Sequence, residues 1–303
     1  MTSNVSPTDK RRTLREIIAA PELGIFPGVF DGYSVRLVQQ KGFQGGLISG
    51  AGLANSRLAR PDVGIMGLES NLAACRALCP AVNIPLIADG DTGYGNAANV
   101  YYATQEFERS GAAGVFFEDQ TFPKRCGHMP GKAVIPAAEM AAKIAAAVDA
   151  RADRELVVIA RTDAATSEGV TDAIFRANLY FDAGADLVFP DAVRSRADIE
   201  RFVAESKGPV CINMGFGLRS RGTTPLLSPA ELRACGVSIA IYARLLSSAA
   251  VMGMSLALDA MAEQATTGIV TERPDLCVDF DQVEGLVGLE EANLLATRYS
   301  DSS

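Results

Sequence analysis

Eight short apolar runs, most of them separated by a helical pattern, constrain the fold of this chain more than any other feature. The runs cover residues 24–30, 45–49, 85–89, 114–118, 155–160, 185–190, 209–213 and 237–243. Their hydrophobicity is nearly continuous rather than alternating, which is typical of parallel strands covered on both faces. Eight strand–helix units in about 250 residues predict an α/β fold, a (β/α)₈ TIM barrel.

Amphipathic helical patterns occupy most intervals between the runs. They cover residues 67–81, 96–111, 136–151, 171–184, 195–206 and 228–236, and residues 245–266 would complete the eighth unit. An open doubly wound sheet is the alternative, but no GxGxxG motif follows the first run and the count of eight favours closure. No linker or repeat divides the chain, so residues 1–303 are expected to form one domain.

Both ends of the chain are expected to extend beyond the barrel. Residues 1–6 are predicted to be disordered, and Thr8 is a candidate cap for a helix that precedes the first strand. The tail that follows the eighth unit carries one further helical pattern near residues 281–299.

Charge and cysteine usage exclude several classes of protein. The net charge of −8 disfavours nucleic acid and anionic membranes as partners. The six cysteines are scattered without a CxxC motif, and residues 1–13 are polar, which indicates reduced thiols in a cytoplasmic protein. The apolar stretch 236–262 is interrupted by Arg244 and is expected to be a strand followed by a helix rather than a membrane span.

Polar residues follow nearly every predicted strand, at the end of the barrel where active sites form. Asp89, Asp91 and Glu118 come from two neighbouring strands and form a set of hard oxygen donors, which suits Mg²⁺ or Mn²⁺ better than Zn²⁺. Gly90 lets the backbone approach its neighbours closely. Helix capping or salt bridges in the following turn are the alternative roles for these acids.

Two further groups at the strand ends are candidates for binding an organic acid. Arg161 ends its strand and needs an anionic partner, either a substrate carboxylate or the neighbouring Asp163 or Asp191. The small-residue turn at residues 49–52 carries backbone N–H groups that are able to hold a carboxylate or an oxyanion.

The segment 116–136 changes from a buried strand into a loop dense in Lys, Arg, Cys, His, Pro and Gly. Gly127 and Gly131 are possible hinges around Cys126 and His128, the only histidine in the chain. The hypothesis is a mobile flap that carries a thiol over a cation site. The alternative is a surface loop with an incidental cysteine.

Five motifs in this order resemble the isocitrate lyase/phosphoenolpyruvate mutase superfamily. They are SGAG (49–52), ADGDTGYGN (88–96), FEDQ (117–120), KRCGHMPGK (124–132) and IARTDA (159–164). The similarity covers most of residues 12–262 and is greatest to the short-chain branch of methylisocitrate lyase, dimethylmalate lyase, oxaloacetate hydrolase and carboxyphosphonoenolpyruvate phosphonomutase. The resemblance implies a Mg²⁺-dependent barrel and a homotetramer, in which the helix at 245–266 and the tail to residue 303 are exchanged with a neighbouring subunit.

The resemblance also assigns roles to individual residues. It makes Asp89, Asp91 and Glu118 the metal shell, directly or through water, and it makes Cys126 the general acid of a carbon–carbon lyase. Lys124, Arg125 and His128 would bias the protonation of Cys126 or latch the loop, and Asp62 would lie near substrate and metal. The substrate-binding set implied by the family pattern is Ser49, Gly50, Ala51, Arg161, Asp191, Asn213 and Thr224.

Three departures from the family pattern limit this transfer of roles. Leu47 stands where many members have a tyrosine, so the catalytic base stays unassigned. Asp191 replaces a common glutamate. The segment after Asn213 lacks an acid and carries Arg219 and Arg221, which suggests a subsite for an additional carboxylate.

These residues predict an enzyme that cleaves a 2-hydroxy di- or tricarboxylate into an α-keto acid and a second carboxylate. Mg²⁺ would polarise the oxygen that becomes the keto group, and a thiol on a closing loop would protonate the carbanion. Hydrolysis or decarboxylation of oxaloacetate, phosphonomutase chemistry and a non-catalytic binding protein are the alternatives.

Overall fold

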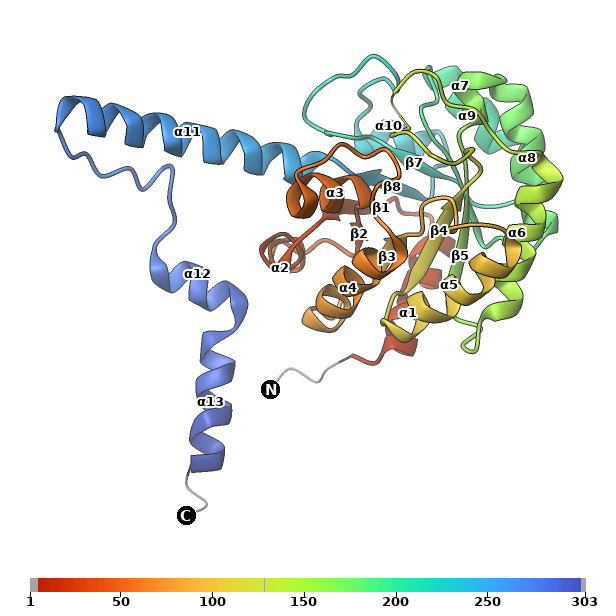
Figure 1. Cartoon of the computed structure of the whole chain (residues 1–303). Helices are drawn as coiled ribbons and strands as arrows, with labels where there is room; N and C mark the ends of the chain where they lie inside the picture. Colours follow the sequence, from red (N-terminus) through yellow and green to blue (C-terminus); the bar gives the residue numbers. More distant parts are fainter. Residues whose placement is uncertain (1–4, 128, 301–303) are drawn as a thin grey trace.

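A computed structural model describes residues 5–127 and 129–300 and shows a closed barrel of parallel strands surrounded by helices (Figure 1). The strands are β1 (Gly24–Val29), β2 (Gly46–Ile48), β3 (Leu86–Asp89), β4 (Gly114–Glu118), β5 (Val157–Thr162), β6 (Leu187–Pro190), β7 (Cys211–Asn213) and β8 (Ile239–Tyr242). They pair in the order β6-β5-β4-β3-β2-β1-β8-β7. A parallel bridge between Val188 and Val210 joins β6 to β7 and closes the barrel. The predicted (β/α)₈ barrel is confirmed.

The helices between the strands cover the outside of the barrel. Those that precede or lie between strands are α1 (Pro7–Ala19), α2 (Gly32–Gln40), α3 (Gly50–Leu58), α4 (Leu68–Leu78), the short 3₁₀ helix η1 (Cys79–Ala81), α5 (Ala97–Arg109), α6 (Ala137–Ala150), α7 (Ala164–Ser167), α8 (Val170–Asp182), α9 (Arg196–Glu205) and α10 (Pro229–Ala234). The last three are α11 (Leu245–Thr267), α12 (Phe280–Val287) and α13 (Leu289–Ser300).

The structure adds helices that the sequence patterns did not reveal. α2, α3 and α7 were not predicted, and the single helix expected in the tail is divided in two at Gly288, which adopts a left-handed conformation with φ of 93°. The cap of α1 is Ser6, whose Oγ accepts the Asp9 N–H, rather than the expected Thr8. The Val5 N–H donates to Asn83, so residues 5 and 6 of the predicted disordered segment are part of the fold.

The N-terminal helix closes the bottom of the barrel. Leu14 and Ile17 of α1 pack with interior side chains that include Phe26 and Phe116. Lys10 is buried beside them and donates to two backbone carbonyls, those of Cys79 and Val82. The opposite end of the barrel, where the strands finish, is thereby left as the open end.

The eighth unit leaves the barrel instead of covering it. β8 is followed by α11, which extends outward and leads to α12 and α13 (Figure 1). None of the residues of α11 is buried, although Val251, Met254 and Leu258 are large and apolar. By length and composition alone α11 is able to cross a membrane, with a mean hydropathy of 1.5, which for a single helix is weak evidence.

Candidate active site

A small cavity lies at the C-terminal ends of the strands and gathers most of the predicted site residues. Its volume is about 40 Å³. The predicted residues that line it are Ser49, Ala51, Asp62, Asp89, Cys126, Arg161, Asp191 and Asn213, and they share it with Leu47, Phe116, Gly127, Phe189, Ile241, Ala243 and Arg244. This volume holds about one water molecule. An organic acid therefore enters only when part of the wall moves.

The loop from residue 120 to residue 135, here called the lid, forms the movable part of that wall. Its base is pinned by an antiparallel bridge between Gln120 and Val134 and by a 2.9 Å bond from the Thr121 N–H to the Ala133 carbonyl. At its tip the Cys126 N–H donates to the Asp62 carbonyl at 3.1 Å. The structure therefore shows the lid closed, with the Cys126 side chain lining the cavity.

Gly127 permits this closure because it has no side chain. A Cβ atom at this position would lie closer than 3.0 Å to both the Asp191 carboxylate and the Arg161 guanidinium. The backbone of the lid therefore rests directly on the Arg161–Asp191 ion pair, whose Nη2 and Oδ2 atoms are 2.8 Å apart.

A lysine of the lid lies among the acids that were predicted to hold a metal. The Nζ atom of Lys124 is 2.5 Å from Asp62 Oδ1 and 2.7 Å from Asp91 Oδ1. Asp91 adopts a left-handed conformation with φ of 47°, just beyond the end of β3, and its N–H donates to Asp89 Oδ1 at 3.0 Å. Gly90 allows this turn, since a Cβ there would collide with Phe117.

Burial controls the protonation of these acids. It raises the pKa of Asp89 to about 7, with a further increase from the charge of Asp91. Burial also raises the pKa of Glu118 well above its usual value and raises that of Asp91. Although burial lowers the pKa of an amine, the neighbouring acids raise the pKa of Lys124 well above its usual value. The charges of Lys124 and Arg161 act in the opposite direction on the pKa values of all three acids, so a cation near these acids favours their ionised forms.

The three carboxylates fit a hydrated divalent cation. Among residues 5–127 and 129–300, no three His, Cys, Asp or Glu side chains converge closely enough to hold a metal ion directly. Glu118 Oε1 is nevertheless buried without a partner among the described residues, whereas Glu118 Oε2 lies 3.1 Å from Arg161 and Asp91 Oδ1 lies 2.7 Å from Lys124. Mg²⁺ usually keeps several of its waters and takes only one or two protein carboxylates, so a shell completed by water matches this donor set.

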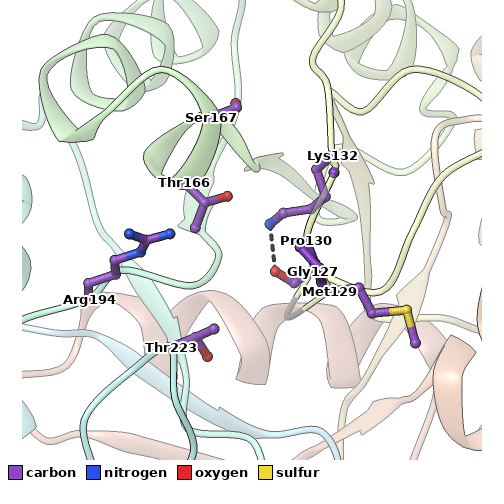
Figure 2. Close-up of a pocket in the computed structure, with 9 residues that line it drawn as sticks. Gly127, Met129, Pro130, Lys132, Thr166, Ser167, Arg194 and Thr223 are labelled. Atoms are coloured by element: carbon purple, nitrogen blue, oxygen red, sulfur yellow. Dashed lines mark hydrogen bonds between the residues drawn. The ribbon is translucent and has the colours of Figure 1, made fainter.

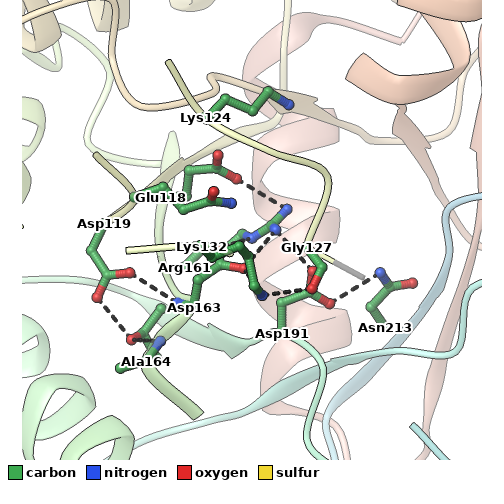
Figure 3. A network of polar contacts seen from close by, with 12 residues as sticks. Glu118, Asp119, Lys124, Gly127, Lys132, Arg161, Asp163, Ala164, Asp191 and Asn213 are labelled. Atoms are coloured by element: carbon green, nitrogen blue, oxygen red, sulfur yellow. Dashed lines mark hydrogen bonds and ion pairs between the residues drawn. The ribbon is translucent and has the colours of Figure 1, made fainter. Parts of the chain in front are cut away.

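Arg161 has protein partners on all sides (Figure 3). Its Nη1 lies 3.1 Å from Glu118, its Nε 2.9 Å from Asp163 and its Nη2 2.8 Å from Asp191. The alternative in which Arg161 pairs with acids of the protein is therefore the one observed. Arg161 lines the cavity, and its predicted role in holding a substrate carboxylate stays a prediction.

A second buried network holds Arg161 in place through Asp163. The side chain of Asp119 accepts the Asp163 N–H and the Thr162 hydroxyl, both at 2.8 Å, and the Tyr180 hydroxyl at 2.8 Å. Burial alone would raise the pKa of Asp163, but the charges of Arg161 and of a lysine in the lid lower it. Asp119, which stands beside Glu118 in the sequence, thus supports the site from behind rather than lining it.

The turn at residues 49–52 is the beginning of α3, and two of its N–H groups already have partners. The Gly50 N–H donates to Asp89 Oδ2 at 3.1 Å, and the Gly52 N–H donates to the Ser49 hydroxyl at 3.1 Å. Ser49 and Ala51 line the cavity, and the role of this turn in holding a carboxylate stays a prediction.

The remaining predicted residues divide between the cavity and its surroundings. The Asn213 side chain donates to Asp191 Oδ1 at 3.2 Å and lines the cavity. Thr224 is buried but does not line it, and His128 lies outside the residues that the structure describes. Arg219 is exposed, whereas Arg221 donates to the Asn213 carbonyl. The two arginines therefore do not form one subsite.

Sequence reasoning assigned no role at the site to two cations that the structure brings there. Arg244 at the end of β8 lines the cavity, with its guanidinium 2.5 Å from Asn55 Oδ1 and 3.6 Å from Cys126 Sγ. Lys132 of the lid donates to the Gly127 carbonyl at 2.5 Å and to Asp163 at 2.7 Å. Arg244 was visible as a polar residue at a strand end, but the pairing of Lys132 requires the folded lid.

Comparison with known proteins agrees with this site. The features in agreement are the order of the strands, the acids at their ends and the cysteine on the lid. Residues 14–262 match the family described as phosphoenolpyruvate phosphomutase. The chain belongs to this family. The resemblance to the wider isocitrate lyase/phosphoenolpyruvate mutase superfamily is thereby confirmed.

Relatives with several different activities are similar to the chain over nearly its whole length. It is 39% identical to the chloroplastic carboxyvinyl-carboxyphosphonate phosphorylmutase of Arabidopsis thaliana over 98% of this chain and 87% of that protein. It is 35% identical to the 2,3-dimethylmalate lyase of Eubacterium barkeri over 95% of this chain and 97% of that protein. It is 40% identical to a probable 2-methylisocitrate lyase of Corynebacterium glutamicum over 90% of this chain and 86% of that protein.

Solved structures give the same range of chemistry. An oxaloacetate acetylhydrolase bound to 3,3-difluorooxalacetate superimposes with a TM-score of 0.89 and 30% identity over 97% of this chain and 98% of that one. A phosphonopyruvate hydrolase bound to oxalate and Mg²⁺ superimposes with a TM-score of 0.83 and 32% identity over 96% of this chain and 99% of that one. Members of the superfamily are lyases, mutases and hydrolases, so the chain is an enzyme, and Mg²⁺ dependence is a property of the superfamily.

Proposed function

We propose that the protein is a Mg²⁺-dependent carbon–carbon lyase that cleaves a 2-hydroxy di- or tricarboxylate to an α-keto acid and a second carboxylate. The observation that carries this proposal is the position of Cys126, which lines the same cavity as Asp62, Asp89 and Arg161. Cleavage of such a substrate requires a proton donor in a site closed to water. A thiol on the closed lid meets both requirements.

The residues of the chain divide the work of this reaction. The substrate hydroxyl loses its proton and becomes the carbonyl of the keto acid as the adjacent carbon–carbon bond breaks. The electrons of that bond pass to the second fragment, and the Cys126 thiol delivers a proton to the resulting carbanion. Leu47 lines the cavity and carries no ionisable group, so the base that takes the hydroxyl proton is not at this position.

Asp89, Asp91 and Glu118 would hold Mg²⁺, mainly through its water molecules. The bound ion supplies a Lewis acid that polarises the oxygen of the nascent keto group. Asp62, whose carboxylate faces the same lysine as Asp91, lies beside this set.

Arg244 is the best candidate to hold a carboxylate of the substrate. Its guanidinium lines the cavity, and among residues 5–127 and 129–300 its side-chain partners are an amide and a thiol rather than an acid. Arg161 is already enclosed by three acids. A guanidinium without an acidic partner gains most from a bidentate carboxylate, so Arg244 fits this role better than Arg161.

A panel of substrates tests the proposed activity. The purified protein with Mg²⁺ would be offered 2-methylisocitrate, 2,3-dimethylmalate, oxaloacetate and phosphonopyruvate, with release of keto acid, oxalate or phosphorus species measured. Turnover of a 2-hydroxy acid supports the lyase. Exclusive turnover of oxaloacetate or of phosphonopyruvate would replace it by the hydrolase or the phosphonate chemistry of other superfamily members.

A pair of cysteine variants tests the role of the thiol. Loss of a general acid lowers turnover by about 10²- to 10⁴-fold, so Cys126→Ser is expected to lose kcat by this factor. The exposed Cys277→Ser in the tail is the matched control and should keep full activity. Full turnover by Cys126→Ser would contradict the proposed mechanism.

We also propose that α11 is exchanged between subunits of a homotetramer in the cytoplasm. A hollow of about 620 Å³ lies at the base of α11, and its apolar walls include Phe30, Phe216 and Met254. A second copy of the apolar and unburied α11 is the occupant that we propose for it. Light scattering would detect the tetramer, and a monomer that retains activity would exclude the exchange.

A further inference from the structure

A second cavity lies on the outer side of the lid and adjoins the catalytic cavity at Gly127. Its volume is about 350 Å³, and Gly127 lines both cavities. The lid forms one wall and the loops that follow β5, β6 and β7 form the other (Figure 2). The residues that characterise it are Gly127, Lys132, Thr166, Arg194 and Thr223.

The lining of this outer cavity is positive in a protein of net charge −8. No Asp or Glu is among its lining residues. Arg194 extends into it from the loop after β6, and no acidic side chain pairs with this guanidinium in the part of the chain that the structure describes. An arginine that faces a cavity without an acid is suited to an oxyanion.

Lys132 reaches the same space from the opposite wall (Figure 2). Its Nζ donates to the Gly127 carbonyl and to Asp163. An ammonium group has three N–H donors, so one remains for a ligand in the cavity. The hydroxyl groups of Thr166 and Thr223 are further polar groups of the lining.

We propose that this outer cavity binds a phosphate group, either inorganic phosphate or the phosphate of a small metabolite. The guanidinium of Arg194 and the ammonium of Lys132 together offer more hydrogen-bond donors than the two oxygens of a carboxylate use well, whereas a phosphate has at least three acceptor oxygens. The ligand bridges Arg194 of the barrel and Lys132 of the lid. Its binding therefore stabilises the closed lid and couples phosphate concentration to access to the catalytic cavity.

Direct binding of inorganic phosphate tests this site. Isothermal titration would compare the Mg²⁺-loaded wild type with Arg194→Gln and with Arg196→Gln. Arg196 is the matched control because it lies two residues away, exposed, and paired with Glu200. We expect Arg194→Gln to weaken phosphate binding at least tenfold and Arg196→Gln to leave it unchanged. Equal affinity in all three proteins, or no binding by the wild type, overturns the proposal.

The effect on the lid has its own readout in the alkylation rate of Cys126. The experiment uses Cys277→Ser, which removes the exposed thiol. The remaining thiols other than Cys126 are buried, and they are Cys75, Cys79, Cys211 and Cys235. Phosphate should slow alkylation severalfold relative to NaCl of equal ionic strength, and the addition of Arg194→Gln should abolish this protection. Equal protection in both proteins would place the anion in the catalytic cavity and refute the proposal.

Two further arms of the alkylation experiment separate the remaining possibilities. In the first arm, malonate replaces phosphate. If malonate protects Cys126 as well as phosphate does, and if Arg194→Gln abolishes that protection, the cavity is a general carboxylate site and the assignment to phosphate is overturned. Neither alkylation nor titration requires turnover. The phosphate site, which rests on the proposed lid, is therefore tested independently of the proposed lyase activity.

Discussion

Replacing Gly127 with alanine tests whether the lid must close for catalysis. The added methyl group would lie closer than 3.0 Å to the Asp191 carboxylate and to the Arg161 guanidinium. Neither neighbour can withdraw easily, because the two are paired at 2.8 Å and Asp191 also accepts from Asn213. The lid is the more movable partner, so the variant is expected to hold it partly open.

The size of the effect follows from this collision. Overpacking of a closely packed contact typically costs about 1–3 kcal/mol. Because the contact exists only when the lid is closed, this cost falls on the closed state alone. It lowers the equilibrium constant for closure by roughly 5- to 150-fold. The free energy of unfolding of the barrel itself should change little.

Two measurements on Gly127→Ala check this reasoning. The value of kcat/KM for the substrate identified by the panel should fall by a factor within the range given above, and the alkylation rate of Cys126 should rise. Gly222→Ala is the control, since a Cβ at this exposed position meets no atom within 4 Å. Unchanged alkylation and unchanged kcat/KM in Gly127→Ala would refute the view that closure is needed.

Three further outcomes are expected. Lys132→Met removes charged hydrogen bonds between the lid and a buried acid and should destabilise the closed lid by about 1.5–3 kcal/mol, which the alkylation rate of Cys126 would report as an increase. Asp153→Asn should cost about 1 kcal/mol at pH 7. Burial opposes ionisation of Asp153, but hydrogen bonds from Arg11 and the Glu155 N–H lower its pKa to about 2, so this contribution disappears as the pH falls from about 4 to about 2. Lys124→Met leaves the acids of the site uncompensated, so Mg²⁺ should raise the melting temperature of this variant more than that of the wild type, and an equal shift in thermal melts would contradict this.

The barrel was predictable because its signal is local and repeated. Each apolar run is a strand in the structure, and β4 covers the predicted residues 114–118 without change. Helices α2 and α3 were missed because they are short, with nine residues each, and contain glycine. Their position depends on packing against the strands rather than on a strong helical pattern.

The sequence predicted which residues lie at the site better than it predicted which charged side chains form ion pairs there. The rule that strand ends meet at one face brought Asp89, Arg161 and Asp191 together correctly. The same rule says nothing about which charges pair, since this depends on side-chain reach and on how the lid folds. The sequence therefore left open whether Arg161 binds a substrate or acids of the protein. The structure shows three ion pairs with acids, and the binding of a substrate carboxylate by Arg161 stays a prediction.

The pairing that the sequence could not reveal links the charge of the site to the position of the lid. The barrel alone brings together Asp89, Asp91 and Glu118, which are buried and whose pKa values are raised by that burial. Closure adds Lys124, which compensates part of this charge, and it brings the Cys126 thiol to the same cavity. The two residues are two positions apart on one loop, so a single movement delivers both a positive charge and a proton donor. An open lid leaves the acids exposed to water, where ionisation costs less. The closed lid supplies one cation itself in Lys124, and a divalent ion bound by the same acids would favour their ionised forms further.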